Sequence, residues 1–124
     1  MPESNDRGRM LAHLRDERDG AELYERVARA EPDPNLAGVY RRMAAVERRH
    51  AAAWEEKLRA AGVAPPRFRP SWRTRALGLL ARRFGPGLVL PAIAAAERAD
   101  AARYRGEPDA MPLAADERSH ARLL

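Results

Sequence analysis

The chain has 124 residues, enough for one domain spanning residues 1–124 with a modest hydrophobic core. Aromatic residues make up only 6% of the chain while Ala and Arg are abundant, and this balance favours an all-α fold. Cysteine is absent, which excludes disulfide bonds and thiolate metal ligands.

The first helix is expected at about residues 6–31, with Asn5 or Asp6 as its N-terminal cap. Small and apolar residues recur along it at alternating spacings of three and four, which places them on one inward face. One acidic residue lies in this otherwise uncharged row. The members of the row are Leu14, Glu17, Ala21, Tyr24 and Ala28.

The second helix is expected at about residues 34–61. Asp33 and Pro34 have the residue types that begin helices, and Gly62 is typical of a helix end. A Glu and a His lie within its apolar row. The members of that row are Leu36, Tyr40, Met43, Glu47, His50, Trp54 and Leu58.

Residues 63–87 are predicted to form a long crossover that contains a short basic helix at about residues 71–84. The larger apolar residues of this helix could pack on the other helices or lie on an anionic membrane surface. Packing is the favoured alternative. These residues are Trp72, Leu77, Leu80 and Phe84.

A third long helix is expected at about residues 88–105 and a fourth at about 109–124. The longest apolar run, residues 88–96, is too short to span a bilayer. Together the elements predict a four-helix bundle of two helical hairpins joined by the long crossover. The inward row of the third helix is Leu90, Ala94, Glu97, Ala101 and Tyr104.

The two hairpins carry the same short sequences. Residues 44–51 and 114–121 both read A-A-x-E-R-x-H-A, and residues 17–24 and 97–104 both read E-R-x-x-A-x-x-Y. The chain is therefore a duplicated unit, in which a Glu helix is followed by a Glu-x-x-His helix. Glu and His three residues apart lie on one helical face, so both can bind the same ion. Two such units supply the ligands of a carboxylate-bridged two-metal site.

Helix register selects Glu17 rather than Glu22 in the first hairpin. Residues at equal distances from the turn of an antiparallel pair lie at equal heights. Glu17 is level with Glu47 and His50, whereas Glu22 would be displaced by about 6 Å. The same count places the two acidic motif residues of the second hairpin level with each other.

Six residues are therefore predicted to bind metal: Glu17, Glu47, His50, Glu97, Glu117 and His120. Two divalent ions would balance four buried carboxylates, and mixed imidazole and carboxylate donors suit iron(II) or manganese. Glu47 and Glu117 are the expected bridging ligands. Two iron ions could reduce dioxygen or peroxide by two electrons. A metal-free network of buried Glu and His is the alternative.

Three further residues are weaker candidates for the site. Asp100 lies one turn after Glu97 and could reach a metal, although a surface position is favoured because Gly20 takes the equivalent place in the first repeat. Tyr24 and Tyr104 could donate hydrogen bonds to ligand carboxylates or simply pack in the core, and neither alternative is preferred.

The repeated sequences resemble those of the rubrerythrin-like branch of the ferritin-like superfamily, and the resemblance covers nearly the whole chain from Leu11 onward. It implies a ferritin-like four-helix bundle with a di-iron centre. In rubrerythrins an acidic residue follows the third-helix Glu by one turn, which Asp100 would match. Rubrerythrins usually also carry a cysteine-ligated rubredoxin domain, and the absence of Cys argues against autonomous peroxidase activity.

More specifically, residues 16–24, 81–86 and 115–124 resemble the cytosolic ferritin-like domain that precedes a membrane domain of the vacuolar-iron-transporter family in bacteria. The resemblance implies that the domain gathers iron(II), and could oxidise it, beside a transport path. It also implies a cytoplasmic location at the inner face of the cell membrane, with a transporter domain following in a longer chain.

Three functions remain open. The favoured one is a metal-binding accessory domain, with iron(II) and dioxygen or peroxide as partners and ferroxidase activity as an option. The second is a stand-alone rubrerythrin-like peroxidase or oxidase. The third is a metal-free basic module that binds a membrane or a nucleic acid through residues 67–83, since the net charge is +5. The favoured function carries no nucleic-acid partner. The oligomeric state is also open, and a homodimer is one possibility because a short fourth helix leaves apolar surface that a second subunit could cover.

Overall fold

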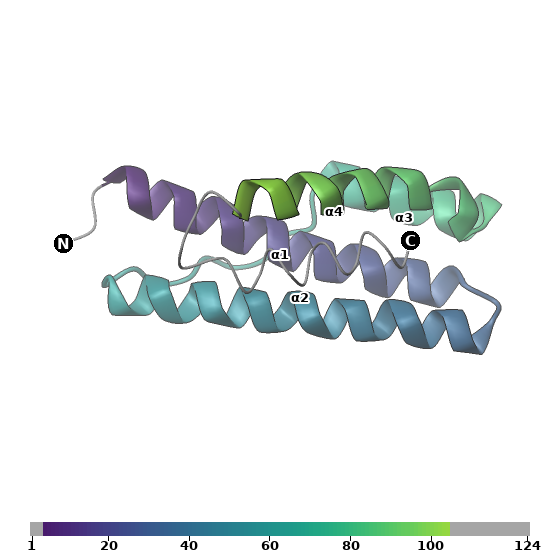
Figure 1. The fold of residues 1–124 in the computed structure, drawn as a ribbon, viewed down its shortest axis with the longest axis horizontal. Coiled ribbons are helices and arrows are strands. Elements are labelled where there is room, and N and C mark those ends of the chain that lie inside the picture. Colours follow the sequence, from purple (N-terminus) through teal and green to yellow (C-terminus); the bar gives the residue numbers. More distant parts are fainter. Residues whose placement is uncertain (1–3, 105–124) are drawn as a thin grey trace.

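The computed structural model describes residues 4–104, with the side chains of residues 6–99, 101 and 102. Every regular element in that range is a helix, which confirms the all-α prediction. The predicted fourth long helix, at residues 109–124, lies outside the described residues. The elements are α1 (Ser4–Ala30), α2 (Pro34–Ala60), α3 (Trp72–Phe84), the 3₁₀ helix η1 (Pro86–Leu88) and α4 (Leu90–Tyr104), as Figure 1 shows.

The first two helices, α1 and α2, form an antiparallel hairpin (Figure 1). The start of α2 agrees with the prediction, because the Asp33 side chain accepts a hydrogen bond from the Asn35 backbone N–H at 2.9 Å and Pro34 is the first helical residue. Gly62 follows the end of α2 with a φ of +78°, which glycine adopts without strain.

The other helix boundaries differ slightly from those predicted. Because α1 already begins at Ser4, Asn5 and Asp6 lie inside it and the prediction that one of them caps the helix is wrong. In the second half, the 3₁₀ turn η1 occupies the residues before α4, so α4 begins at Leu90, two residues later than predicted. Figure 1 shows α4 running in the same direction as α2, so the connection between them crosses the length of the molecule.

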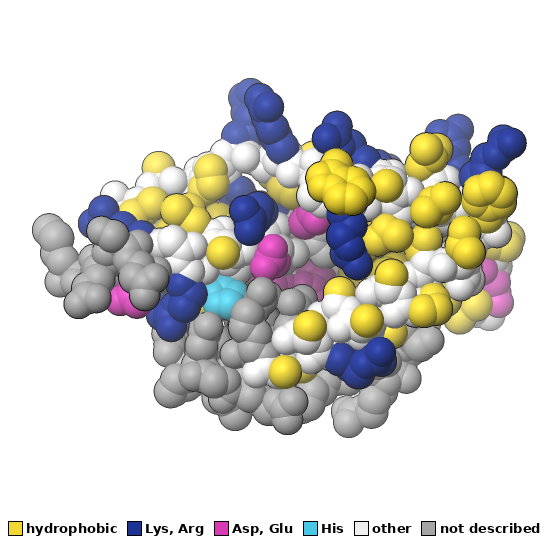
Figure 2. Space-filling model, turned by 90° about the horizontal axis from the view of Figure 1, so that it is seen from above, with side chains coloured by type: hydrophobic (Ala, Val, Ile, Leu, Met, Phe, Trp, Pro, Cys, Tyr) yellow, Lys and Arg dark blue, Asp and Glu magenta, His cyan; other side chains and the backbone are white. Residues whose placement is uncertain are grey.

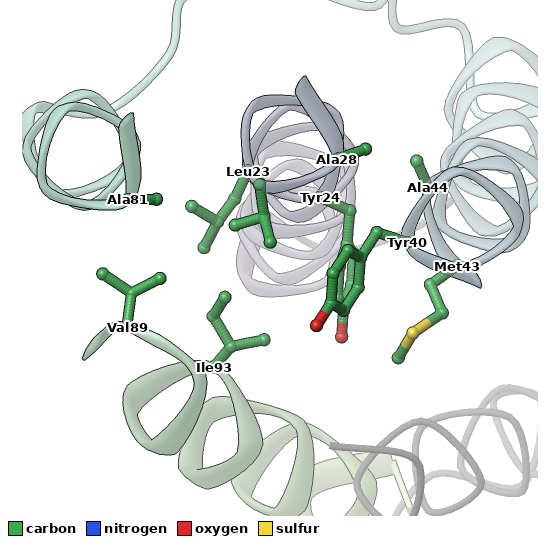
Figure 3. Close-up of a cluster of buried hydrophobic side chains, with 10 residues drawn as sticks. Leu23, Tyr24, Ala28, Tyr40, Met43, Ala44, Ala81, Val89 and Ile93 are labelled. Carbon is green, nitrogen blue, oxygen red and sulfur yellow. The ribbon is translucent and has the colours of Figure 1, made fainter. Parts of the chain in front are cut away.

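One apolar cluster joins all four α-helices near the tip of the α1–α2 hairpin. Figure 3 shows Tyr24 of α1, Tyr40 of α2 and Ile93 of α4 among its members. Burial, and after it the negative charge of Glu31, raise the pKa of Tyr40 above its ordinary value of 10.0. The buried members are Leu23, Tyr24, Val27, Ala28, Tyr40, Met43, Ala44, Ala81, Val89 and Ile93.

A second cluster lies toward the open end of the hairpin and consists of Met10, Leu14, Ala51, Trp54 and Leu58. Every member of the inward rows predicted for α1 and α2 is buried except one. Leu36 is the exception. It is exposed because it lies in the first turn of α2, at the tip of the hairpin.

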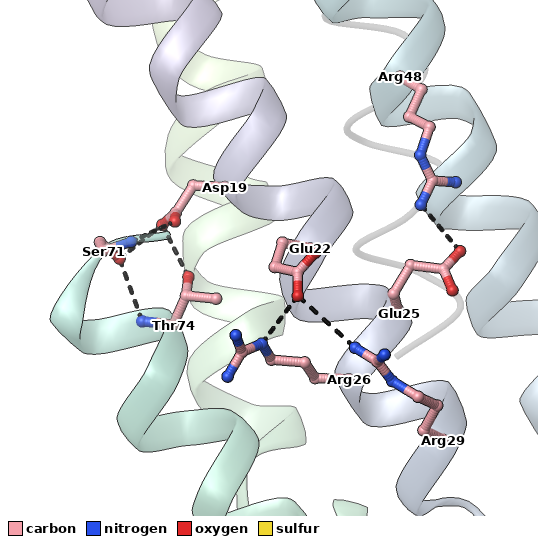
Figure 4. Close-up of polar contacts among 8 residues, drawn as sticks. All are labelled: Asp19, Glu22, Glu25, Arg26, Arg29, Arg48, Ser71 and Thr74. Atoms are coloured by element: carbon pink, nitrogen blue, oxygen red, sulfur yellow. Dashed lines mark hydrogen bonds and ion pairs between the residues drawn. The ribbon is translucent and has the colours of Figure 1, made fainter. Parts of the chain in front are cut away.

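The N-terminus of α3 is held by a residue of α1. The Asp19 carboxylate accepts hydrogen bonds from the Ser71 backbone N–H at 2.8 Å, the Ser71 hydroxyl at 2.7 Å and the Thr74 hydroxyl at 2.7 Å (Figure 4). The Ser71 hydroxyl oxygen in turn accepts from the Thr74 backbone N–H at 3.1 Å, which is a conventional N-cap. Asp19 therefore fixes both the position of α3 and its rotation about its own axis.

This rotation turns the small residues of α3 inward: Thr74, Gly78 and Ala81 are its buried residues. A Cβ atom at position 78 would lie 2.7 Å from Cδ of Arg26, so any larger residue would force the Arg26 side chain to shift. The prediction that the larger apolar residues of α3 pack inward is therefore wrong for Trp72, Leu80 and Phe84, which are 76%, 38% and 67% exposed. It is confirmed for Leu77, which packs against the first cluster.

Replacing Asp19 by alanine is expected to lower the free energy of unfolding by about 2 kcal/mol, because three hydrogen bonds to one carboxylate are lost and the Ser71 cap loses its support. Urea denaturation followed by circular dichroism measures the change. Glu25→Ala is the control, because the Glu25–Arg48 ion pair at 3.0 Å lies on the surface and should contribute less than about 1 kcal/mol. Equal losses in the two variants would contradict the assigned role of Asp19.

Candidate metal centre

Three of the predicted ligands are brought together inside the α1–α2 hairpin. Glu17 comes from α1, while Glu47 and His50 lie one turn apart on α2. All three side chains are buried, and one ligand atom from each lies within 4.8 Å of the other two. This buried Glu/Glu/His group could hold a metal ion.

The group is positioned by the helix periodicity around it. On one side lie residues of the second apolar cluster, among them Leu14 and Ala51. On the other side lies the first apolar cluster, which contains Tyr24 and Tyr40. Because apolar side chains three or four residues away on both helices face the same way, the polar side chains between them must also point inward. The register that favours Glu17 over Glu22 is the register observed.

The spacing of the donor atoms fits a metal ion. Nδ1 of His50 lies 3.3 Å from Oε2 of Glu17. Two donor atoms, each about 2.1 Å from one ion and at right angles to each other, lie about 3.0 Å apart. The pair thus needs little rearrangement to bind one ion. Without an ion, the same contact is a hydrogen bond or ion pair whose character depends on the protonation of His50.

A cavity of about 210 Å³ adjoins the group. Glu47, Glu97 and Tyr24 contribute to its lining. The α1 backbone approaches Glu47 closely at Gly20, where an added Cβ atom would lie 3.6 Å from Oε2 of Glu47. The carboxylates of Glu47 and Glu97 therefore border one space, although they come from opposite halves of the chain.

Glu97 is held by a residue of the other repeat. It is buried on α4, and the Tyr24 hydroxyl of α1 donates a hydrogen bond to its Oε1 atom. The ring of Tyr24 also belongs to the core, and the role of Glu97 as a metal ligand stays a prediction. The hydrogen bond fixes Glu97 over the hairpin that carries Glu17, Glu47 and His50.

Glu22 takes no part in the group. Its carboxylate lies on the outer side of α1 and pairs with Arg26 at 3.0 Å and Arg29 at 3.5 Å (Figure 4). Among the other predicted residues, Glu117 and His120 lie outside the described residues. The side chains of Asp100 and Tyr104 lie outside the described side chains. The roles of these four residues stay predictions.

The third histidine, His13, is a buried neighbour that the sequence patterns did not single out. Its ring stacks on Trp54, with ring centroids 4.6 Å apart and planes inclined by 17°. Nζ of Lys57 lies 4.5 Å from the centroid of the same indole. His13 precedes Glu17 by four residues and Trp54 follows His50 by four, so a search one helical turn from the motif residues would have found the stack.

Acidic side chains and a histidine are visible together in Figure 2, set back from the surrounding surface. No helix within residues 4–104 has the length and apolar character needed to cross a membrane. Comparisons with models of known protein families, with curated proteins and with solved structures find no match to this chain. A functional interpretation of this chain therefore rests on the geometry of its own residues, above all the buried group of Glu17, Glu47 and His50.

Proposed function

We propose that this chain binds a carboxylate-bridged pair of divalent metal ions, iron(II) or manganese(II), and gathers iron(II) as the cytosolic domain of an iron transporter. The observation that carries the metal site is the buried group of Glu17, Glu47 and His50, whose donor atoms lie within 4.8 Å of one another. Buried carboxylates in contact repel one another, and bound cations offset that repulsion.

The repeat supports the second half of the proposed site. In the first hairpin the Glu and Glu-x-x-His sequences meet at one height. The same sequences recur in the second hairpin, where Glu97 borders the cavity that Glu47 also lines. On this proposal Glu117 and His120 complete the ligand set in a ferritin-like four-helix bundle. Iron(II) held there would supply electrons to dioxygen or peroxide.

Each residue of the described group has a defined role in this proposal. Glu47 stands between the two halves and would bridge the ions, whereas Glu17 and His50 would hold one ion from the side of the first hairpin. Tyr24 keeps the Glu97 carboxylate oriented through its hydrogen bond. Among the described residues, apolar clusters lie on both sides of the group, and the adjoining cavity would give an ion access to it.

The experiment that tests the proposal is an anaerobic titration of the metal-free chain with iron(II). Binding is expected to saturate near two ions per chain. Tyr24→Phe should lower the affinity about tenfold because Glu97 loses its orienting bond. Tyr40→Phe, which removes a hydroxyl from another ring of the same cluster, is the matched control and should leave the affinity unchanged. Absence of saturable binding would refute the proposal.

A further inference from the structure

The middle of the chain has an unusual charge distribution. Between Glu56 and Glu97 there is no acidic residue, although the whole chain contains 18. The same stretch carries eight basic residues: Lys57, Arg59, Arg67, Arg69, Arg73, Arg75, Arg82 and Arg83. This stretch includes α3 and both of its flanking connections, so the surface it forms is strongly positive.

Large apolar side chains lie among these charges. Trp72 and Leu79 are seven residues apart on α3, which places them on one helical face, and they are 76% and 64% exposed. This face is opposite the small residues that α3 buries against α1. Phe84 and Leu88 are also exposed. Figure 2 shows hydrophobic side chains lying between basic ones along one edge of the molecule.

Beside this face lies an arginine cleft, a cavity of about 400 Å³ between α1 and α3. Four arginines line it: Arg26, Arg29, Arg75 and Arg82. Glu22 pairs with the two on α1 (Figure 4). The other two lining arginines, Arg75 and Arg82 of α3, have no ion pair with any described residue. The cleft therefore keeps an excess of positive charge, and Leu79 lies at its border.

We propose that the outer face of α3 and the arginine cleft form a docking surface for an anionic lipid bilayer. The guanidinium groups of the cleft bind lipid phosphates, and the side chains of Trp72 and Leu79 enter the boundary between headgroups and acyl chains. Tryptophan favours this boundary because its ring is apolar and its N–H is polar.

Charge and apolar character together select the bilayer over two other occupants. A nucleic acid would use the arginines but would gain nothing from exposed Leu79 and Phe84. A second copy in a symmetric dimer would bring the same surface of each chain together, so the acid-free faces would repel each other. Only an anionic bilayer offers phosphates and an apolar layer at once.

The two tryptophans make the test direct, because Trp54 is buried and Trp72 is exposed. The metal-free 124-residue chain is mixed with phosphatidylcholine vesicles, with or without phosphatidylglycerol, while tryptophan emission and co-sedimentation are recorded. Only the anionic vesicles should bind the chain, with a blue shift of emission that Trp72→Phe removes. High salt should weaken the binding.

Two double variants separate the contributions of charge and apolar contact. Arg75→Gln/Arg82→Gln and Trp72→Ala/Leu79→Ala should each weaken binding to anionic vesicles about tenfold or more. All four side chains are exposed, so circular dichroism should show an unchanged fold. Arg41→Gln/Arg49→Gln on the exposed side of α2 removes the same charge and should change binding less than about threefold.

Four results would overturn the proposal. The first is absence of binding to anionic vesicles, and the second is an equal loss of binding in the α2 control, which would indicate attraction by net charge alone. The third is binding to inorganic phosphate or duplex DNA that does not depend on Trp72 or Leu79. The fourth is a dimer in sedimentation analysis that already shifts the Trp72 emission without lipid.

Discussion

Replacing Glu47 by glutamine should weaken iron(II) binding by at least about a hundredfold, because the proposed bridging carboxylate becomes a neutral amide of the same size. In the unaltered chain, iron(II) at about a hundred times its dissociation constant should add about 2.7 kcal/mol to the free energy of unfolding. That corresponds to an increase in Tm of about 10 °C. The variant should show no increase, which anaerobic thermal denaturation with and without iron(II) measures.

Glu25→Gln is the matched control for this prediction. Glu25 lies on α1 two turns from Glu17, and its carboxylate pairs with Arg48 on the surface at 3.0 Å. The variant carries the same change in charge, so it should keep the full stabilisation by iron(II). If Glu47→Gln retained that stabilisation, or Glu25→Gln lost it, the metal would bind elsewhere on the chain.

Replacing Trp54 by alanine is expected to lower the free energy of unfolding by about 3–5 kcal/mol, the largest effect of any single substitution discussed for stability. Trp54 is 1% exposed and lies between the His13 ring and the Lys57 ammonium group. Alanine would leave a cavity and remove both contacts. Trp54→Phe keeps an aromatic ring and should cost about 1–2 kcal/mol. Urea denaturation gives both values.

The chain supplies its own control, because its second tryptophan is exposed. Trp72→Ala should change the free energy of unfolding by less than about 0.5 kcal/mol, since a solvent-exposed ring contributes little packing. A large loss for Trp72→Ala would show that the outer face of α3 is covered in solution. A small loss for Trp54→Ala would contradict the packing described around His13.

The sequence was sufficient to bring the Glu/Glu/His group together in the first hairpin, because the contacts within that hairpin are local. Helix periodicity determines which faces of α1 and α2 meet, and the short turn between them sets their register. These two facts are enough to bring Glu17 level with Glu47 and His50. The Asp33 cap and the Gly62 stop are equally local, and both were predicted correctly.

Long-range contacts explain what could not be predicted. The orientation of α3 depends on Asp19, which is 52 residues before Ser71, and on the absence of a side chain at Gly78. Apolar periodicity within α3 alone favours burial of Trp72 and Phe84, whereas the cap and the close approach to Arg26 turn those residues outward. The hydrogen bond between Tyr24 and Glu97 likewise joins residues from opposite repeats.

The origin of the three donor atoms has a consequence for how such a chain could arise. Glu17, Glu47 and His50 all belong to one pair of consecutive helices, and the sequence of that pair recurs in the second half. A single ancestral hairpin carrying these residues could have paired with a copy of itself around a twofold axis, so that two identical peptides formed one bundle. Fusion of the two genes would then have freed each half to diverge, which leaves Gly20 and Asp100 at equivalent places.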